Sequence, residues 1–410
     1  MQANIIVASP MWSLSGVSVF SSNLVRGLRA RGIPAHILLT QPKQLEAPSM
    51  PLPSDIPVEH LTGIRHDSWK PRWQAMVRYL EERAPCIYVP NSDFGHSCVS
   101  PKLSKRVCII GIVHSDDPQH YEHVSRLGRY WNGIVAVSKA VAEKTSSLDP
   151  GFSQRLVVIP YGVAIPNGLP KRSEDSNACL KIVYAGRLDQ RQKRILDLPK
   201  IAEALFARKI PFELTIIGGG SYQDRVLAAS KHLIDQGVVR FLATVPNERV
   251  LEIVEHNHAL VMTSGFEGMP IILLEAMGRG CVPVVTEIRS GIPELVLDGV
   301  NGCVVPVGAI DSFVDCLCKL QQNVNWYSTL SANAYASVVA SGYRVEDMVQ
   351  RYIELFQFVL RDAESGVYRR PPGPIVPPPS VRLSWKDRLP VPVRALAASV
   401  KQYLISPRHG

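Results

Sequence analysis

Short apolar runs alternate, along the first part of the chain, with segments in which apolar residues recur at helical spacing. Asn4–Ser9 is such a run, and the segment after it has apolar residues at Val17, Phe20, Leu24 and Leu28. Further runs fall at 35–39, 86–89, 107–113, 134–137 and 156–159. Strands that alternate with helices are typical of a parallel sheet covered on both faces, so we predict an α/β domain.

The same alternation restarts after a polar stretch marked by Pro and Gly at residues 166–176. Apolar runs then fall at 181–185, 214–217, 239–242, 259–262, 282–286 and 303–305. A chain of 410 residues is also too long for one ordinary core. We therefore predict two Rossmann-like domains, residues 1–163 and 164–342, each a doubly wound parallel sheet.

Two further segments follow the second domain. Tyr343–Leu360 has the pattern of a long amphipathic helix that closes the fold, and residues 343–362 are assigned to it. Residues 363–410 form a basic tail, Pro-rich and extended at 371–379. Leu389–Ile405 has the spacing of a short amphipathic helix, for which a membrane surface, the protein body and disorder are alternative states.

The composition narrows the class of protein. Hydrophobic residues make up 46% and charged residues 20%, as in a globular protein. No apolar run reaches the roughly 18 residues of a membrane span, and no basic leader precedes the first strand, so we expect a cytoplasmic location. The eight cysteines are scattered without a Cys-x-x-Cys pair, which favours reduced thiols over a zinc site.

The net charge of +9 is unevenly distributed. Residues 1–163 carry 17 basic and 12 acidic side chains, and residues 363–410 carry 8 and 2. This asymmetry can attract anionic lipid, so a peripheral contact with the inner face of a membrane is one hypothesis. Plain solubility charge explains it equally well. We expect no nucleic-acid partner, because no basic patch is interleaved with aromatic residues.

A strand, a glycine turn and clustered cations open the second domain, in Val183-Tyr-Ala-Gly-Arg-Leu-Asp-Gln-Arg-Gln-Lys193. Gly186 permits a tight turn at the carboxyl end of the strand, where ligands bind in open α/β sheets. Arg187 and Lys193 can both reach a diphosphate from this turn, Arg as a fork of donors and Lys as a point charge. Solvated cations in a loop are the alternative.

Glycines also follow the next strand, in Ile216-Ile-Gly-Gly-Gly-Ser221. The dinucleotide fingerprint lacks its third glycine here, so we do not expect NAD. A close approach of the backbone to a nucleotide and a plain turn both stay open.

The segment Ser264-Gly-Phe-Glu-Gly-Met-Pro-Ile-Ile-Leu-Leu-Glu-Ala-Met277 sets the carboxylates Glu267 and Glu275 eight positions apart. A helix is predicted to begin near Pro270 or Ile271, because proline is tolerated at an early helical position. Free amides at the helix start can seat a phosphate, and carboxylates accept from sugar hydroxyls, so the segment predicts a sugar-nucleotide site. A buried network around Glu275 with Glu267 on the surface is the alternative.

Two positions of the first domain are expected to face the same site. Gly16, in Ser13-Leu-Ser-Gly-Val17, follows the first strand and opens a helix, so main-chain amides could face a phosphate there. A simple strand-to-helix turn is the alternative. His114 ends a strand in Val113-His-Ser-Asp-Asp-Pro118, at an edge where sites form, although a lone histidine is as often structural.

With these residues the sequence resembles the retaining glycosyltransferases of family four, which have the GT-B fold. The resemblance runs from residue 3 to about residue 361. Its most specific parts are Val183–Lys193, Glu267-x7-Glu275 and Ser290-Gly-Ile-Pro-Glu-Leu-Val296. Ile134-Val-Ala-Val-Ser-Lys139 and Val158-Ile-Pro-Tyr-Gly-Val163 support it.

The resemblance implies that two Rossmann-like domains face each other across a cleft, the first binding the acceptor and the second the nucleotide sugar. By this resemblance, Arg187 and Lys193 hold the diphosphate, and Gly16 and the amides of Ile271 and Ile272 face phosphate. Glu275 holds the ribose. Glu267, with the amides of Gly268 and Met269, holds the transferred sugar, and His114 lies beside that sugar. The sequence departs from the family at Ser15, Ala243 and Ser290, where glycines are frequent.

The implied activity is retaining transfer of a hexose from a UDP- or GDP-linked sugar to a glycan or a lipid-linked glycan. The sequence has no Asp-x-Asp triplet, so no metal is expected and the nucleotide sugar is a substrate, not a cofactor. A nucleotide-sugar epimerase on the same fold and a catalytically silent sugar-nucleotide-binding protein are the alternatives.

Overall fold

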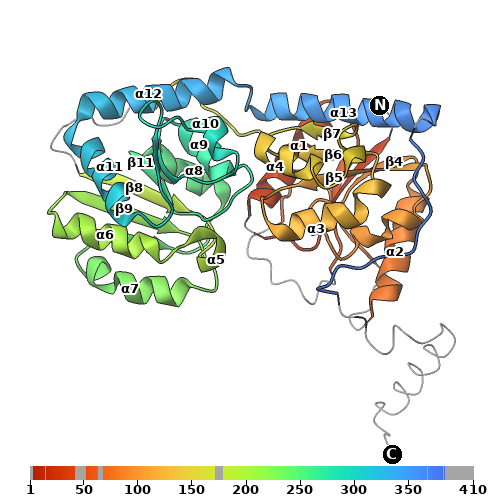
Figure 1. The fold of residues 1–410 in the computed structure, drawn as a ribbon, viewed down its shortest axis with the longest axis horizontal. Helices are drawn as coiled ribbons and strands as arrows, with labels where there is room; N and C mark the ends of the chain where they lie inside the picture. Colours follow the sequence, from red (N-terminus) through yellow and green to blue (C-terminus); the bar gives the residue numbers. More distant parts are fainter. Residues whose placement is uncertain are drawn as a thin grey trace, which may run out of the picture.

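The computed structural model describes residues 3–13, 15–41, 52–62, 68–170, 179–366, 368–381 and 383. In this part of the chain two parallel sheets, of seven and six strands, form the centres of two domains that lie side by side (Figure 1). The predicted α/β architecture is therefore confirmed.

The first sheet has the strand order β3-β2-β1-β4-β5-β6-β7. Its strands are β1 (Asn4–Ser9), β2 (Ala35–Leu39), β3 (Val58–His60), β4 (Cys86–Val89), β5 (Val107–Val113), β6 (Gly133–Ala136) and β7 (Leu156–Val158). The central strands are buried along their whole length, as expected where helices cover both faces of a parallel sheet. The sequence pattern missed β3, because Val58-Glu-His60 contains a single apolar residue.

The helical segments of this domain are α1 (Gly16–Ala30), α2 (Trp69–Glu82), η2 (Ser97–Lys102), α3 (Pro118–Leu127), η3 (Gly128–Tyr130), α4 (Lys139–Ser146) and η4 (Pro150–Phe152). Side-chain caps define several of their starts: Ser15 caps α1, Asp117 caps α3 and Ser138 caps α4. These caps fix where the chain turns at the carboxyl edge of the sheet.

The second sheet repeats the topology in the order β10-β9-β8-β11-β12-β13. Its strands are β8 (Leu180–Ala185), β9 (Phe212–Ile217), β10 (Val239–Leu242), β11 (Ala259–Met262), β12 (Val282–Thr286) and β13 (Cys303–Val305). Its helices are α5 (Gln190–Lys193), α6 (Asp197–Ala207), α7 (Gln223–Asp235), α8 (Asn247–Glu255), α9 (Ile271–Met277), α10 (Ile292–Leu295), α11 (Ile310–Gln322) and α12 (Val324–Ala340). In both sheets the order in which strands are added reverses beside the first strand, between β1 and β4 and between β8 and β11, and open α/β sheets bind ligands at such a point.

The chain passes between the domains twice, at neighbouring places. Val163 N donates to Tyr343 O over 2.9 Å, and Arg344 Nη1 donates to Ile165 O over 3.3 Å. Beyond this point α13 (Val345–Ser365) returns across the first domain and packs against α1 (Figure 1). The helices are so close that a side-chain carbon on Gly27 would lie 2.5 Å from Val349 Cγ2.

The described part of the tail is fastened to the first domain. Arg370 donates to the carbonyls of Leu103, Ser104, Val107 and Tyr130 over 2.7 to 2.9 Å, and to Asn132 Oδ1 over 3.0 Å. The segment 371–379 forms no helix or strand, and its last residue lies in a turn, so the extended conformation expected there stays a prediction. The amphipathic helix predicted at 389–405 lies outside the described residues.

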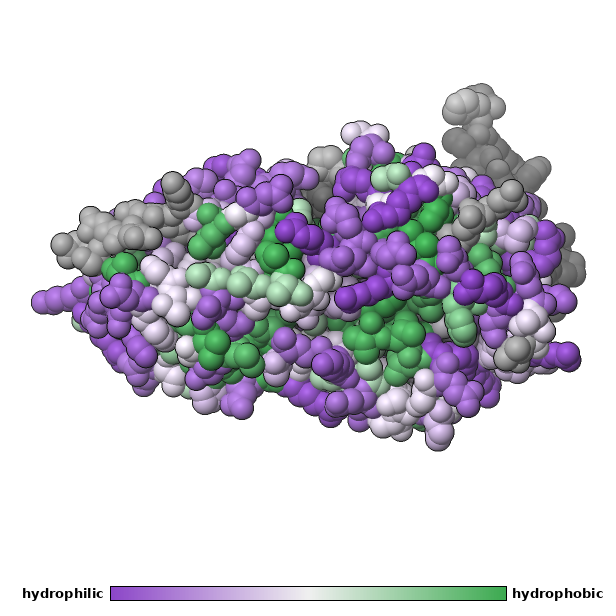
Figure 2. Space-filling model, turned by 90° about the horizontal axis from the view of Figure 1, so that it is seen from above, coloured by the Kyte–Doolittle hydropathy of each residue, from purple (hydrophilic) through white to green (hydrophobic). Residues whose placement is uncertain are grey.

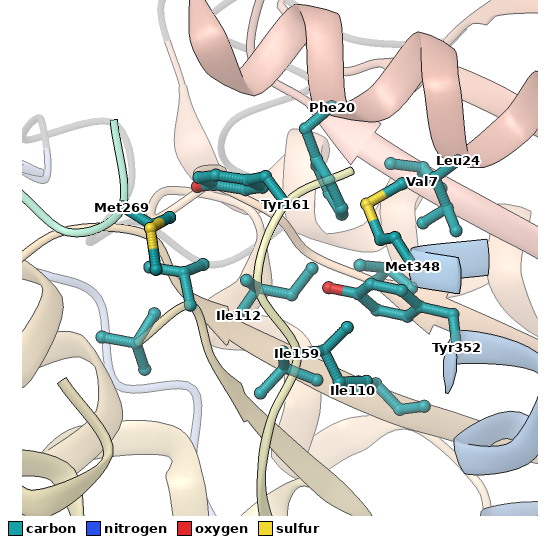
Figure 3. Close-up of a cluster of buried hydrophobic side chains, with 14 of the residues drawn as sticks. Val7, Phe20, Leu24, Ile110, Ile112, Ile159, Tyr161, Met269, Met348 and Tyr352 are labelled. Carbon is teal, nitrogen blue, oxygen red and sulfur yellow. The ribbon is translucent and has the colours of Figure 1, made fainter. Parts of the chain in front are cut away.

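A continuous apolar core joins the two domains. Figure 3 shows part of it: Phe20 and Leu24 of α1 and Met348 and Tyr352 of α13 surround side chains of the first sheet, and Met269 of the second domain lies near Tyr161. A separate core fills the opposite face of the second sheet. On the surface seen in Figure 2, hydrophilic side chains separate the apolar groups over both domains. No helix in the described ranges is long and apolar enough to cross a membrane.

Candidate active site

The loop after β8 carries two of the predicted cations. Asp189 Oδ1 accepts from Gln192 N over 2.7 Å and starts the short helix α5, which ends at Lys193. Arg187 is exposed on the same loop, and its Nη2 donates to Gln192 Oε1 over 2.6 Å. Arg187 and Lys193 therefore lie on one loop, and the Gln192 side chain between them in sequence holds Arg187.

The glycines after β9 pack against the backbone of this loop. A side-chain carbon on Gly218 would lie 2.0 Å from Gly186 O, and one on Gly220 would lie 2.5 Å from Leu188 O. Both glycines also have positive φ angles, of 139° and 157°, which favour glycine. These glycines therefore let the backbone pack closely against the neighbouring loop of the same domain, and its approach to a nucleotide stays a prediction.

Lys193 and Glu267 form the centre of the site. Lys193 Nζ lies 2.5 Å from Glu267 Oε1, and the two side chains are only 16% and 7% exposed. Ser264 Oγ donates to the same oxygen over 2.7 Å, and Gln192 Nε2 lies 3.4 Å from Oε2. Contacts of this kind hold a buried carboxylate in one orientation. The loop after β8 and the segment 264–277 therefore share one site, and Glu267 is not the surface residue of the alternative interpretation.

The start of α9 meets the start of α1 across the domain interface. Pro270 is the N-cap residue of α9, one position before the early helical place predicted for it. The first donors within the helix are Leu273 and Leu274, both to Pro270 O, so the amides of Ile271 and Ile272 precede its hydrogen-bond ladder. A side-chain carbon on Gly16 would lie 3.3 Å from Ile271 Cδ1. Two helix N-termini, each favourable to an anion, therefore lie together.

Glu275 is buried on α9, with 4% of its surface exposed. Asn247 Nδ2, at the start of α8, donates to Glu275 Oε1 over 3.0 Å. Burial raises the pKa of Glu275 to about 7, against the opposing effects of Asn247 and of the positive charge on Arg279. A carboxyl group with this pKa can be ionised by a ligand that brings hydroxyl donors to it.

His114 is held by two side chains of its own domain. Its Nε2 lies 2.5 Å from Asn91 Oδ1 and its Nδ1 lies 2.5 Å from the Tyr161 hydroxyl. Asn91 Nδ2 donates to Ser21 Oγ, so Asn91 Oδ1 is free to accept from His114 Nε2–H, and Nδ1 then accepts from Tyr161. Burial, and then the nearby His120, lowers the pKa of His114 well below its usual value. The ring is therefore neutral.

Backbone contacts bring the two domains together beside these groups. Ser115 and Gly268 form an antiparallel bridge, and Asp116 N donates to Glu267 O over 3.3 Å. A side-chain carbon on Gly268 would lie 2.2 Å from His114 O, so only glycine fits against the other domain here. His114 and Glu267 thus lie on segments in direct contact.

The structure brings most of the predicted residues into one region between the domains. Hydrogen bonds and close contacts join Arg187 to Gln192, Lys193 to Glu267, Gly268 to His114, and Gly16 to Ile271. Glu275 lies further along α9, with Asn247 at its side. In the ranges that the structure describes, no group of three or more His, Cys, Asp or Glu side chains is arranged to hold a metal ion.

Several residues of the site were not predicted from the sequence. They are the side chains that orient the predicted ones: Ser264, Gln192, Asn247, Asn91 and Tyr161. The sequence could have indicated two of them, because Ser264 lies just beyond the end of β11 and Asn91 just beyond the end of β4. Nothing in the local pattern marks which partner each of these side chains selects.

Known proteins resemble this chain in sequence and in fold. Residues 179–323 match the family described as "Glycosyl transferases group 1". Lipopolysaccharide 1,6-galactosyltransferase of Escherichia coli (strain K12) is 34% identical over 255 residues, covering 60% of this chain and 68% of the relative. The enzyme of the same name from Salmonella typhimurium is 31% identical over 254 residues, covering 59% and 67%.

Among solved structures, that of Anabaena HepE in complex with UDP-glucose matches with a TM-score of 0.70 at 18% identity, over 87% of this chain and 99% of that one. The fold is thus the α/β GT-B fold, as predicted. The chain belongs to the group 1 glycosyltransferases, which confirms the family resemblance found in the sequence.

Proposed function

We propose that the protein is a retaining glycosyltransferase that needs no metal and moves a hexose from a UDP- or GDP-linked sugar to a glycan acceptor. The observation that carries this proposal is the 2.5 Å contact between Lys193 and Glu267. It joins the cationic loop after β8 to the segment with two carboxylates, so diphosphate-binding and sugar-binding groups belong to one site.

The departing nucleoside diphosphate is the group that most needs stabilising. When the bond between the anomeric carbon and the diphosphate breaks, negative charge grows on the leaving oxygen. Arg187, Lys193 and the first amides of α9 supply fixed positive charge for it, and Gly16 lets α1 approach from the other domain. Such prearranged groups lower the barrier, because they need no reorganisation during the reaction.

The two carboxylates have separate tasks in this proposal. Glu275 accepts from the ribose hydroxyls, and Glu267, with the amides of Gly268 and Met269, binds the transferred sugar. The contacts of Ser264, Gln192 and Lys193 keep Glu267 in place for that purpose.

The leaving phosphate is the base for the acceptor hydroxyl, which gives retention because attack and departure share one face. His114 fits this scheme as a neutral ring beside the sugar and not as a proton carrier. Both of its nitrogens are already hydrogen-bonded to Asn91 and Tyr161, and its pKa is well below its usual value.

The acceptor class is inferred from relatives. Two relatives at least 31% identical are named lipopolysaccharide 1,6-galactosyltransferases, so we propose a lipopolysaccharide-type or lipid-linked glycan as acceptor and polysaccharide biosynthesis as the process. UDP-hexoses are the first donors to test, because HepE is crystallised with UDP-glucose. A cytoplasmic protein that touches the inner face of an anionic membrane through its basic tail fits such an acceptor.

The test combines a donor screen with a transfer assay. Ligands that bind only the folded protein raise its melting temperature, so UDP- and GDP-hexoses are screened by thermal shift. Each hit is then incubated with and without a lipopolysaccharide core acceptor, and released nucleotide and product are measured. Acceptor-dependent release with retained configuration supports the proposal. A changed sugar nucleotide without acceptor indicates an epimerase, and binding without turnover indicates a silent binding protein.

A further inference from the structure

Two sequence motifs that have no task in the reaction described above meet across the domain interface. One is Ile134–Lys139, which runs from β6 into the start of α4, and the other is Ser290–Val296, which contains α10. The contact between them is a hydrogen bond from Lys139 N to Glu294 Oε1 over 2.7 Å. Figure 1 shows α10 on the side of its domain that faces α4.

Glu294 completes the N-terminal cap of α4 from the other domain. The first amides of a helix have no partner within the helix. Ser138, the N-cap residue, accepts from Val141 N over 3.3 Å. Glu294 takes one further amide, that of Lys139. A carboxylate at this place also interacts favourably with the positive end of the helix dipole.

The segment that carries Glu294 is fixed to the sugar-binding loop. Gly291 N donates to Gly268 O over 2.5 Å. A side-chain carbon on Gly291 would lie 2.7 Å from Met269 Cε and 2.9 Å from Gly268 O, so the two segments pack without a gap. Gly268 in turn bridges to Ser115 of the first domain. Any force that holds α4 against Glu294 therefore also holds Ser115 against Gly268.

We propose that Glu294 is a positioning residue that holds the two domains against each other by capping α4, and so seats the His114–Ser115 segment against Glu267 and Gly268. This proposal rests on the proposed function for its effect on turnover, whereas its effect on domain closure is independent of the reaction. The two motifs thus act together to hold the domain interface.

The expected size of the effect follows from the value of a helix cap. Loss of one capping side chain changes a folding or closing equilibrium by roughly 5- to 30-fold. The equilibrium constant for domain closure should therefore fall by that factor in Glu294→Ala, and the closed fraction falls with it. Glu294→Gln keeps an oxygen acceptor at the same place without the charge, so it should recover most of the closed fraction.

A matched control lies on the same two elements. Arg289 Nη2 is 3.6 Å from Glu143 Oε2, again joining the loop before α10 to α4, but both side chains are more than half exposed. Exposed ion pairs contribute little. Arg289→Ala should therefore leave closure and turnover within about twofold of the unaltered protein.

The experiment uses the full chain with one fluorophore on each domain. Closure is measured by energy transfer with and without UDP, and nucleotide affinity, kcat and acceptor KM are measured in parallel. We expect Glu294→Ala to open the protein and to lower kcat/KM for transfer by up to roughly 5- to 30-fold, with a smaller loss of nucleotide affinity and with recovery in Glu294→Gln.

Either of two outcomes overturns the proposal. In the first, Glu294→Ala stays as closed as the unaltered protein. In the second, nucleotide affinity falls as much as kcat/KM and Glu294→Gln recovers nothing, which would mean that the residue only maintains the second domain. If no donor supports transfer at all, the proposed function fails, and the energy-transfer measurement still decides whether Glu294 holds the domains together.

Discussion

Replacing Glu275 by Gln should make the protein more stable above neutral pH while weakening donor binding. Glu275 is buried and 4% exposed, and its pKa is raised to about 7 from an ordinary value of 4.5. Gln has the same shape and keeps an oxygen that can accept from Asn247 Nδ2. The substitution therefore removes the ionisation and little else.

The magnitude follows from the two pKa values. Between pH 4.5 and 7 the folded protein keeps a proton on Glu275 that the unfolded chain has lost. The stability of the unaltered protein therefore falls as pH rises through this interval, by about 1.4 kcal/mol for each pH unit. The total loss is about 3 kcal/mol, and it is complete above pH 7. Glu275→Gln has no such loss.

Scanning calorimetry of both proteins from pH 4.5 to 8.5 measures the effect. All other titrating groups are shared, so the difference between the melting temperatures of the second domain isolates Glu275. The midpoints should agree near pH 4.5, and the variant should melt roughly 6 to 12 °C higher at pH 8.

Donor affinity of the variant should fall roughly 10-fold or more, because one charged acceptor for the ribose is lost. Parallel melting curves across the pH range would refute the reasoning, since they would mean that Glu275 is already ionised in the folded protein. A donor affinity equal to that of the unaltered protein would refute the ribose contact separately.

Other substitutions test the remaining parts of the site and of the fold. Lys193→Ala should lower kcat roughly 100- to 1,000-fold, because a charge aimed at the leaving group is lost; Lys231→Ala, in an exposed pair, should change it less than about twofold. Gly268→Ala should lower kcat/KM more than about 100-fold, because the added side-chain carbon would lie 2.2 Å from His114 O of the other domain. Gly265→Ala is the control: its side-chain carbon would meet only ordinary contacts at 3.8 Å, so this variant should be tolerated. Arg370→Ala should lower the melting temperature of the first domain by roughly 6 to 12 °C, since about 3 kcal/mol of charged hydrogen bonds is lost; an unchanged transition would mean that the tail is not fastened there.

The fold could be predicted because buried parallel strands leave an unmistakable pattern. Val107–Val113 and Val282–Thr286 are buried at every position, and each was expected at the same boundaries. Helix ends were less certain, since they depend on caps. Pro270 was expected at an early helical position and is the N-cap residue, because its ψ angle of 116° is extended.

The site was predictable in its parts and not in its connections. Glycine turns, cations and carboxylates at strand ends indicate a phosphate and sugar site, and the structure brings Lys193 and Glu267 together, although the sequence did not predict their ion pair. The orienting contacts of His114 with Tyr161 and of Lys139 with Glu294 link residues 47 and 155 positions apart. Such pairings are set by packing of whole domains, so no local pattern contains them.

Calorimetric binding of UDP and GDP to the unaltered protein and to the double variant Arg187→Ala/Lys193→Ala tests the central claim most directly, namely that fixed positive groups gather around a nucleoside diphosphate. We predict that at least one nucleotide binds the unaltered protein. The double variant should bind the same nucleotide at least roughly 100-fold more weakly. Equal affinity in both proteins, or no binding of either nucleotide to a folded protein, would contradict the account.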